Sequence, residues 1–400
     1  MIKIQNLNAL YLALAPILSV YKFSNGILLY FVLILLLAIL NLFAGNLIYA
    51  VRQRSNEVQW YVSIFVIGFI GLVFNSETSY FNKSLFVNNF ISVTLFFCAL
   101  IFCTAKYNVT LLKKTLIFCG IAAAVICIGQ RIQLLITGSF YKDFFIPGLE
   151  VKRDLETFST NRVSAFFTEP AHLSIYLLPI FYMTLQEGKM LTAVLIALGI
   201  LFSGSTTGLL LVALLSICYI AKNKKRKIYI LYIISSVSLL YLGIMYMFPD
   251  VVVDNLEKLN SVDSGGVRLL GPLQYLGLYD SGQWCFGIGL NQLSDFLSSK
   301  GISVVNEWGI EKNANYANAV IYMLLCYGLF GLCFFIRYLI FTMKMRHSDV
   351  GFIIYAFGIF LSDQVLFNMN LLYVLTFMII SQTLINENDE NSISNSSVVL

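Results

Sequence analysis

The chain has 400 residues, of which 58% are hydrophobic and only 12% are charged, and its mean hydropathy is +0.81. A soluble globular domain carries roughly 25% charged residues. This chain therefore lacks the charge to cover a water-facing surface, and it is predicted to lie in a membrane. Its formal net charge of +5 comes from short basic connections between apolar runs, so it does not indicate a nucleic-acid partner.

The apolar runs are long and continuous rather than alternating, which predicts an all-α polytopic membrane protein and not a β-barrel. We expect about twelve transmembrane helices, near residues 8–22, 26–50, 58–74, 85–104, 115–136, 171–186, 190–203, 207–221, 228–248, 316–342, 350–363 and 369–385. The N-terminal run is predicted to be the first helix, because no small-residue cleavage site follows it. One transmembrane domain over residues 1–385 and a disordered cytoplasmic tail over 386–400 are expected.

Basic residues in the short connections orient these helices. One set of connections carries Arg52, Arg54, Lys106, Lys113, Lys114, Lys189, Lys222, Lys224, Lys225, Arg226, Lys227, Lys344 and Arg346. The opposite set carries only Lys22 and Lys83. Positive charge is enriched on the cytoplasmic side, so both termini are predicted to be cytoplasmic. Two large loops, about residues 137–170 and 249–315, then face outward.

The sequence lacks the common nucleotide-binding motifs. It has no G-x-x-x-x-G-K-[ST] phosphate loop and no pair of aspartates two residues apart. No cysteine–histidine cluster has metal-ligand spacing, and Cys285 is the one cysteine outside the predicted helices. We therefore expect no cofactor and no metal, and a substrate that arrives from the bilayer already activated.

The first outward loop ends in the segment NRVSAFFTEPAHLSIYLLP. Pro170 suits the first turn of a helix, which places Glu169 or Thr168 at its cap and points the positive end of the helix dipole outward. Arg162, Glu169 and His172 around this helix start suit transfer of a group away from a phosphate leaving group. The competing interpretation is that these loop charges are only solvated and that Glu169 caps the helix.

Further candidates lie elsewhere in the outward half of the chain. Arg131 lies near the outer end of its helix, where a charge is costly and usually functional or paired. Asp363, between the last two predicted helices, is a similar candidate, although it could simply lie at the surface. The second loop places Tyr275 and Trp284 around Arg268. Their aromatic faces suit stacking on sugars, although Trp and Tyr are also enriched at membrane interfaces.

The segment N-R-V-S-A-F-F-T-E-P-A-H resembles the R-x-x-G/A-x-F-x-E-P segment of the bacterial O-antigen and capsular polysaccharide polymerases, the Wzy family. The small-residue break Ser203–Gly208 is similar to the S-x-T/S-x-G segment of that family. Residues Arg268, Gly287–Asn291 and Asn315 through Gly328 and Gly331 fall where the family places its second loop and the helix after it. The plan of about twelve helices with two outward loops agrees along the whole chain.

This resemblance implies a glycosyltransferase, of the hexosyltransferase type, with the C-type membrane-embedded fold. Such enzymes join repeat units carried on undecaprenyl pyrophosphate at the outer face of the bacterial inner membrane, with a chain-length regulator and a flippase as further partners. The resemblance and the residue chemistry together assign catalysis to Arg162, Glu169, Arg268 and His172. They assign substrate binding to Arg131, Arg153, Tyr275, Trp284, Asn291 and Asn315.

Two other functions compete with polymerisation. An O-antigen ligase would use the same donor, but ligases are associated with a histidine before a late helix, where this chain has only Asn315 and Asn318. The absence of that histidine leaves the general base open, and the Arg-x₁₀-Gly motif of some polymerases is also absent. A flippase for lipid-linked glycans fits twelve helices equally well. However, transporters place polar residues near the midplane of repeated halves, and this sequence shows no internal repeat.

Overall fold

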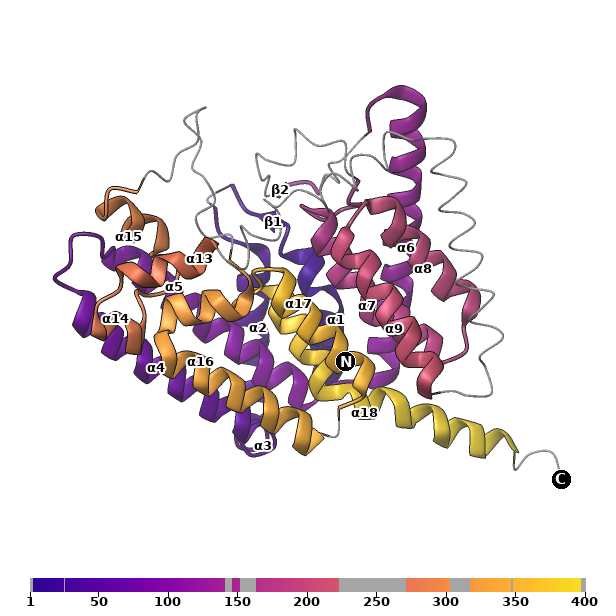
Figure 1. Cartoon of the computed structure of the whole chain (residues 1–400). Coiled ribbons are helices and arrows are strands. Elements are labelled where there is room, and N and C mark those ends of the chain that lie inside the picture. The colour runs from indigo at the N-terminus through magenta and orange to yellow at the C-terminus, as the bar shows by residue number, and fades with distance from the viewer. Residues whose placement is uncertain are drawn as a thin grey trace.

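The computed structural model describes residues 3–24, 26–140, 146–151, 163–222, 271–302, 317–346 and 348–396, and most of it is helical (Figure 1). The helical class predicted from the long apolar runs is thus confirmed. The first part of the chain forms α1 (Ile4–Leu18), α2 (Leu29–Phe43), α3 (Leu47–Gln53), α4 (Ser55–Asn75), α5 (Lys83–Cys98), the π-helical turn η1 (Ala99–Cys103) and α6 (Val109–Thr137). Two short strands, β1 (Tyr21–Lys22) and β2 (Glu150–Val151), pair antiparallel.

The second part of the chain contributes helices to the centre and to both sides of the bundle (Figure 1). It forms α7 (Pro170–Gln186), α8 (Met190–Ser203), α9 (Thr206–Lys222), α13 (Gly271–Gln274), η4 (Tyr275–Leu278), α14 (Ser281–Phe286), α15 (Leu293–Ser299), α16 (Ala319–Arg346), α17 (Val350–Ser362) and α18 (Met369–Ser396). The second outward loop therefore contains short helices where the sequence suggested only a loop. Likewise, α18 is helical through Ser396, inside the segment that the sequence predicts to be a disordered tail.

Within the part of the chain that the structure describes, four helical segments are long and apolar enough to cross a membrane, namely Ser55–Asn75, Lys83–Cys103, Val109–Thr137 and Ala319–Arg346. The bent pair α2 and α3, at 106°, passes the same test jointly, and five further apolar helices are shorter. The twelve predicted segments coincide with helices except 228–248, which lies outside the described residues. A polytopic membrane protein is therefore well supported, while the count of twelve and the C-type fold stay predictions.

The bundle has two chemically different ends. Basic connections and their acidic partners meet at one, which we call the basic end: Lys113 lies 3.6 Å from Glu187, and Lys222 pairs with Asp349. The opposite end, which we call the loop end, carries β1, β2, the end of α6 and the start of α7 (Figure 1). Glu169, a described candidate of the first outward loop, belongs to the loop end.

Helix α7 lies at the centre and is enclosed by α8, α9, α17 and α18. Pro179 interrupts its hydrogen bonding, because proline has no N–H to donate to the carbonyl four residues before it. That carbonyl belongs to Ile175, and it accepts a hydrogen bond from the Tyr355 hydroxyl at 2.8 Å. The next carbonyl, of Tyr176, accepts from the Tyr373 hydroxyl at 3.0 Å. Two tyrosines from neighbouring helices thus satisfy polar groups that lipid could not.

Helix α16 is broken at Gly328, whose φ of 65° and ψ of −168° are not helical. The break frees the carbonyls of Leu325 and Cys326, which accept from the backbone N–H groups of Ile288 at 3.1 Å and Gly289 at 3.0 Å. The Tyr279 hydroxyl also donates to Leu325 at 3.0 Å, and burial raises the pKa of Tyr279, so it stays a neutral donor.

The two chain segments at this break cross so closely that only glycine fits on either side. A Cβ on Gly287 would overlap the Cys326 carbonyl, and one on Gly328 would overlap the Cys285 carbonyl. Both glycines also have positive φ, at 76° and 65°, which side chains disfavour. The segment from 285 to 289 is therefore seated in the body of the protein instead of projecting as a free loop.

Candidate active site

The start of α7 is built as its sequence predicted. Glu169 is the N-cap residue, Pro170 occupies the first turn, and the Glu169 side chain makes no capping hydrogen bond. His172 places its Nδ1 atom 2.8 Å from the Thr168 hydroxyl. The first N–H groups and the positive end of the helix dipole lie at the loop end, where they favour an anion. Glu169 is therefore at the cap position but does not use its carboxylate as the cap.

Gln130 holds the segment that leads into α7. Its side-chain amide donates to the Ala165 carbonyl at 3.0 Å and accepts from the Ala165 N–H at 2.8 Å, and both residues are buried. Ala165 has a φ of 50°, a conformation that is uncommon outside glycine and clusters at functional sites. The Ser164 hydroxyl closes the same turn by donating to the Phe167 carbonyl at 2.7 Å. A strained turn is thus fixed directly before Glu169.

Arg131, the next residue on α6, is only 6% exposed. Its Nε donates to the Phe202 carbonyl at 3.0 Å, at the end of α8 where Gly204 takes a φ of 69° and turns the chain into α9. Gly208 then packs so closely on Ser174 of α7 that a side chain there would overlap it. The consecutive residues Gln130 and Arg131 therefore tie the start of α7 and the α8–α9 break to one helix.

Asp363 lies at the loop end beside the start of α16. Its carbonyl accepts from the Ala319 N–H at 3.0 Å, and its Oδ1 accepts from the Gln364 N–H at 2.8 Å. The other carboxylate oxygen, Oδ2, is buried and has no hydrogen-bond partner. Helices α7 and α17 are adjacent and antiparallel, so Asp363 and the start of α7 lie at the same end. A buried carboxylate oxygen without a donor is suited to accept a proton.

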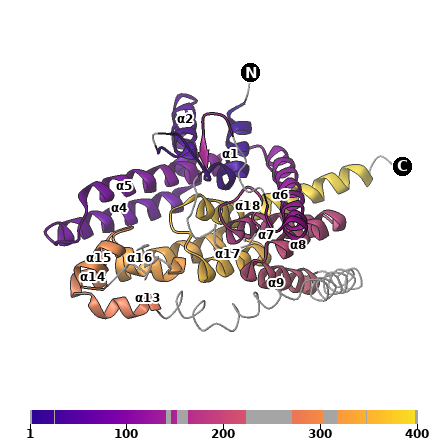
Figure 2. The same ribbon diagram turned by 90° about the horizontal axis from the view of Figure 1, so that it is seen from above.

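The aromatic candidates of the second loop lie on the other side of the molecule. Tyr275 on η4 and Trp284 on α14 lie with α4 and α16, whereas Arg131, Glu169 and His172 lie with α6, α7 and α8 (Figures 1 and 2). Trp284 is 37% exposed and Tyr275 is partly buried. The structure thus groups three of the predicted site residues through α6 and α7 and leaves these aromatics apart from them.

Asn291 belongs to a separate polar network at the loop end. It has a φ of 58°, accepts from the Tyr322 hydroxyl at 2.9 Å, and donates to the Asn89 side chain at 2.8 Å. This network joins α5 and α16 to the segment before α15. The other predicted residues, Arg153, Arg162, Arg268 and Asn315, lie outside the described residues.

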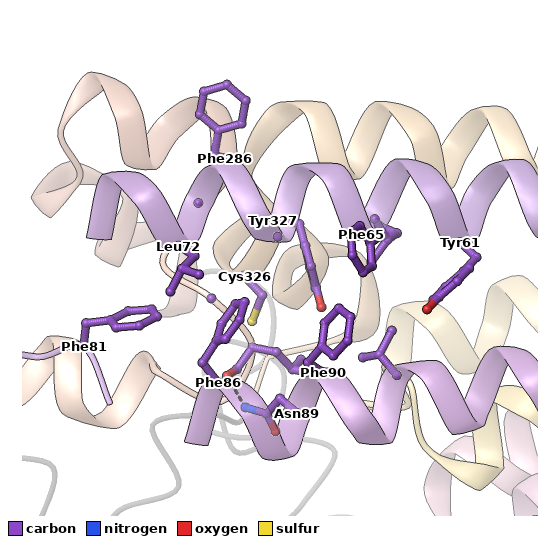
Figure 3. Close-up of a pocket in the computed structure, with 16 residues that line it drawn as sticks. Tyr61, Phe65, Leu72, Phe81, Phe86, Asn89, Phe90, Phe286, Cys326 and Tyr327 are labelled. Carbon is purple, nitrogen blue, oxygen red and sulfur yellow. Dashed lines mark hydrogen bonds between the residues drawn. The ribbon is translucent and has the colours of Figure 1, made fainter. Parts of the chain in front are cut away.

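An apolar pocket opens between α4 and α5, next to this network (Figure 3). Its walls include Tyr61, Phe65, Leu72, Phe86 and Phe90, and the break in α16 contributes to its floor through Cys326 and Tyr327. Its cavity volume is about 40 Å³. The Asn89 amide at its edge already donates to the Leu290 carbonyl at 2.7 Å. Such a lining suits a hydrocarbon chain better than a sugar.

Sequence reasoning missed Gln130 and gave Asp363 little weight. A signal for Gln130 was present, because a glutamine within an apolar helix must find a partner when it is buried. For Asp363 the sequence allowed a surface position equally well. The contact between Asn291 and Tyr322 joins residues 31 apart in sequence, and no local pattern indicates it.

Comparison with known proteins identifies the family. The family model described as WcaD colanic acid polymerase matches residues 8–382 of this chain, which includes every helix described above except the ends of α1 and α18. No curated protein matched the chain. The match confirms the resemblance to polysaccharide polymerases and supports a membrane-bound, glycosyltransferase-like enzyme of polysaccharide biosynthesis. The chain belongs to the WcaD colanic acid polymerase family.

Proposed function

We propose that this protein polymerises oligosaccharide repeat units carried on undecaprenyl pyrophosphate, at the outer face of the bacterial inner membrane. It transfers the growing glycan from its lipid carrier to a sugar hydroxyl of the next lipid-linked unit. The observation that carries this proposal is a set of hydrogen bonds at the loop end, by which Gln130 and Arg131 tie the start of α7 to the α8–α9 break. These hydrogen bonds join two of the segments that resemble the Wzy polymerases, namely the one that leads into α7 and Ser203–Gly208.

The proposed reaction breaks the bond between the anomeric carbon and the diphosphate oxygen, and it forms a bond from that carbon to the acceptor oxygen. Negative charge develops on the departing diphosphate. The first N–H groups of α7, Arg131 and Arg162, which lies seven residues before Glu169 in the sequence, supply positive charge for it. The proton of the acceptor hydroxyl passes to a carboxylate, for which Glu169 and Asp363 are the candidates. Glu169 does not cap its helix, and Asp363 Oδ2 has no donor.

The hydrocarbon part of the carrier needs an apolar surface that is continuous with the bilayer. The pocket between α4 and α5 offers one, because both helices are long enough to cross the membrane and expose apolar side chains such as Phe69 and Ile91. Its edge meets the Asn291 network at the loop end. We place a stretch of the polyprenyl chain there. A flippase that supplies the units and a regulator of chain length complete the proposed partners.

Purified protein supplied with lipid-linked repeat units tests this function directly. We expect a ladder of products from the wild type, and loss of the ladder in Arg162→Ala and Glu169→Gln with normal protein levels. Removing one donor aimed at developing charge typically lowers the rate by about 10²–10³. Glu150→Gln is the matched control, since Glu150 is an exposed carboxylate at the same end. Full ladders from both site variants would contradict the site.

A deletion strain separates polymerase from ligase. A polymerase deletion keeps single repeat units on the surface glycan and loses the ladder. Accumulation of lipid-linked polymer beside a bare acceptor would instead indicate a ligase. Unpolymerised units retained at the inner face would indicate a flippase.

A further inference from the structure

A second cavity lies at the basic end, opposite the proposed polymerising site. Its volume is about 780 Å³, and it lies among the α3–α4 junction, the turn after η1, the end of α16 and α18. Three cationic side chains, Arg54, Lys106 and Arg346, line it, and its other lining residues are neutral: Tyr49, Gln53, Ala105, Tyr107, Val109, Met345, Ile379, Gln382 and Thr383. A cavity with three cations and no carboxylate in its wall attracts an anion.

Arg54 is the most deeply placed of these cations, at 4% exposed. It donates to the Thr104 carbonyl, and its Nε is buried without a hydrogen-bond partner. Burial lowers the pKa of Arg54, while the nearby Glu57 carboxylate acts in the opposite direction. A guanidinium stays protonated in proteins, so its charge remains and a donor is left without an acceptor.

The other two cations are held at the cavity by single contacts. Arg346 donates to the Gln53 carbonyl at 2.8 Å, and the Lys106 ammonium lies 3.5 Å from the Asn46 side-chain oxygen. Both partners are neutral. Since a guanidinium has five N–H donors and an ammonium has three, these contacts leave donor capacity for a ligand.

The charge of the cavity is only partly balanced from within. Glu57 lies close enough to Arg54 and Arg346 to affect them electrostatically, yet both its carboxylate oxygens are buried without a hydrogen-bond partner. Two other cations of this end, Lys113 and Lys222, have direct acidic partners in Glu187 and Asp349. Three cations against one carboxylate leave an excess of about two positive charges by simple Coulomb counting.

We propose that this cavity binds a phosphate group on Arg54, Lys106 and Arg346. Phosphate fits because its oxygens accept several charge-assisted hydrogen bonds at once and because its one or two negative charges match the excess. Two sources share this chemistry. One is the headgroup of an anionic phospholipid in the adjacent leaflet, and the other is a phosphate-bearing solute. The site is distinct from the loop end and does not depend on the function proposed there.

A purely structural role makes a different prediction. In that case Arg54 and Arg346 only join helices by donating to the carbonyls of Thr104 and Gln53, and Lys106 is a solvated charge. Replacing any of them would then change thermal stability without changing the affinity for any phosphate compound.

The test uses the full-length protein, purified in detergent and stripped of phospholipid. Native mass spectrometry measures binding of phosphatidylglycerol, with phosphatidylcholine as the zwitterionic comparison, and equilibrium dialysis measures binding of inorganic phosphate. The variants are Arg346→Gln and Lys106→Gln, which change partly exposed residues and leave buried Arg54 in place. Arg52→Gln and Lys344→Gln are matched controls, because both are exposed cations of the same end.

We expect the wild type to bind at least one of the two probes, and each site variant to weaken that binding about tenfold or more, the effect of removing a charged hydrogen-bonding partner. Binding of phosphatidylglycerol alone identifies the lipid as the source, and binding of inorganic phosphate identifies a solute. The proposal is overturned if neither probe binds. It is also overturned if the controls weaken binding as much as the site variants, since general surface charge would then explain the result.

Discussion

Replacing Gln130 by alanine should release the turn before α7 without unfolding the protein. The wild-type side chain makes two hydrogen bonds to the backbone of Ala165, at 3.0 and 2.8 Å. Each buried group left without its partner costs about 1–3 kcal/mol, so the closed turn loses about 2 kcal/mol or more. The φ of 50° at Ala165 adds strain of order 1–3 kcal/mol that the two Gln130 hydrogen bonds no longer oppose.

Hydrogen exchange followed by mass spectrometry measures this loss of stability in the turn itself. A loss of 2 kcal/mol is roughly thirtyfold in population, so amides of the segment from Ser164 to Thr168 should exchange about thirtyfold faster. Polymer synthesis should fall in proportion to the lost fraction of closed turn if the turn positions Glu169. Gln130→Glu should give an intermediate effect, since a carboxylate can still accept from the Ala165 N–H but cannot donate to its carbonyl.

Gln133→Ala is the control for this experiment, because Gln133 lies one turn further along the same helix and is exposed. It should leave both exchange and polymer length unchanged. Unchanged exchange in Gln130→Ala would show that the two hydrogen bonds do not hold the turn. Faster exchange with a full polymer ladder would show that the turn does not position the reacting groups.

Three further predictions concern the break in α16, the topology and the chemistry. Gly328→Ala should lower the thermal midpoint of the purified protein by several degrees, because the added Cβ would overlap the Cys285 carbonyl. This shift is expected for a loss of about 1–3 kcal/mol. Gly277→Ala is the control and should leave the midpoint unchanged, because a Cβ there meets nothing within 4 Å. Reporter fusions at Lys344 should report cytoplasm and fusions at Ser281 the outside, and the opposite result at Ser281 would remove the outward site. Polymerisation by purified protein should continue in excess chelator because arginines can counter the diphosphate charge; abolition that one added metal reverses would refute this mechanism.

The positions of the helices could be predicted from the sequence because apolar runs of sufficient length have few alternatives in lipid. The start of α7 at Pro170 was predicted for a local reason, since proline fits the first turn of a helix but disrupts the interior of one. The break at Gly328 could not be predicted in this way. A glycine in a helix is only a mild signal, of about 1 kcal/mol, and the donors that make this break stable come from Ile288 and Gly289.

The candidate site shows the same division between local and distant causes. Glu169 and Arg131 were found because each breaks an apolar pattern at the end of a helix. Gln130 was not predicted because its partner, Ala165, is 35 residues away and contributes only its backbone N–H and carbonyl. Asp363 was a weak candidate from the sequence, and it became a candidate proton acceptor when the structure placed one of its oxygens in a buried position without a donor.

The broken helix α16 also constrains the order in which the protein is made. A hydrocarbon environment penalises each backbone carbonyl that has no donor by several kcal/mol, so α16 cannot rest in lipid alone with the Leu325 and Cys326 carbonyls open. The donors at Ile288 and Gly289 precede α16 in the chain and therefore leave the ribosome first. We expect the segment from 285 to 289 to stay unpaired at the membrane surface at first. It then docks on the break in α16 when α16 leaves the insertion machinery. Nascent chains that end before Gly328 should accordingly leave this segment open to proteolysis, and chains that extend past Arg346 should protect it.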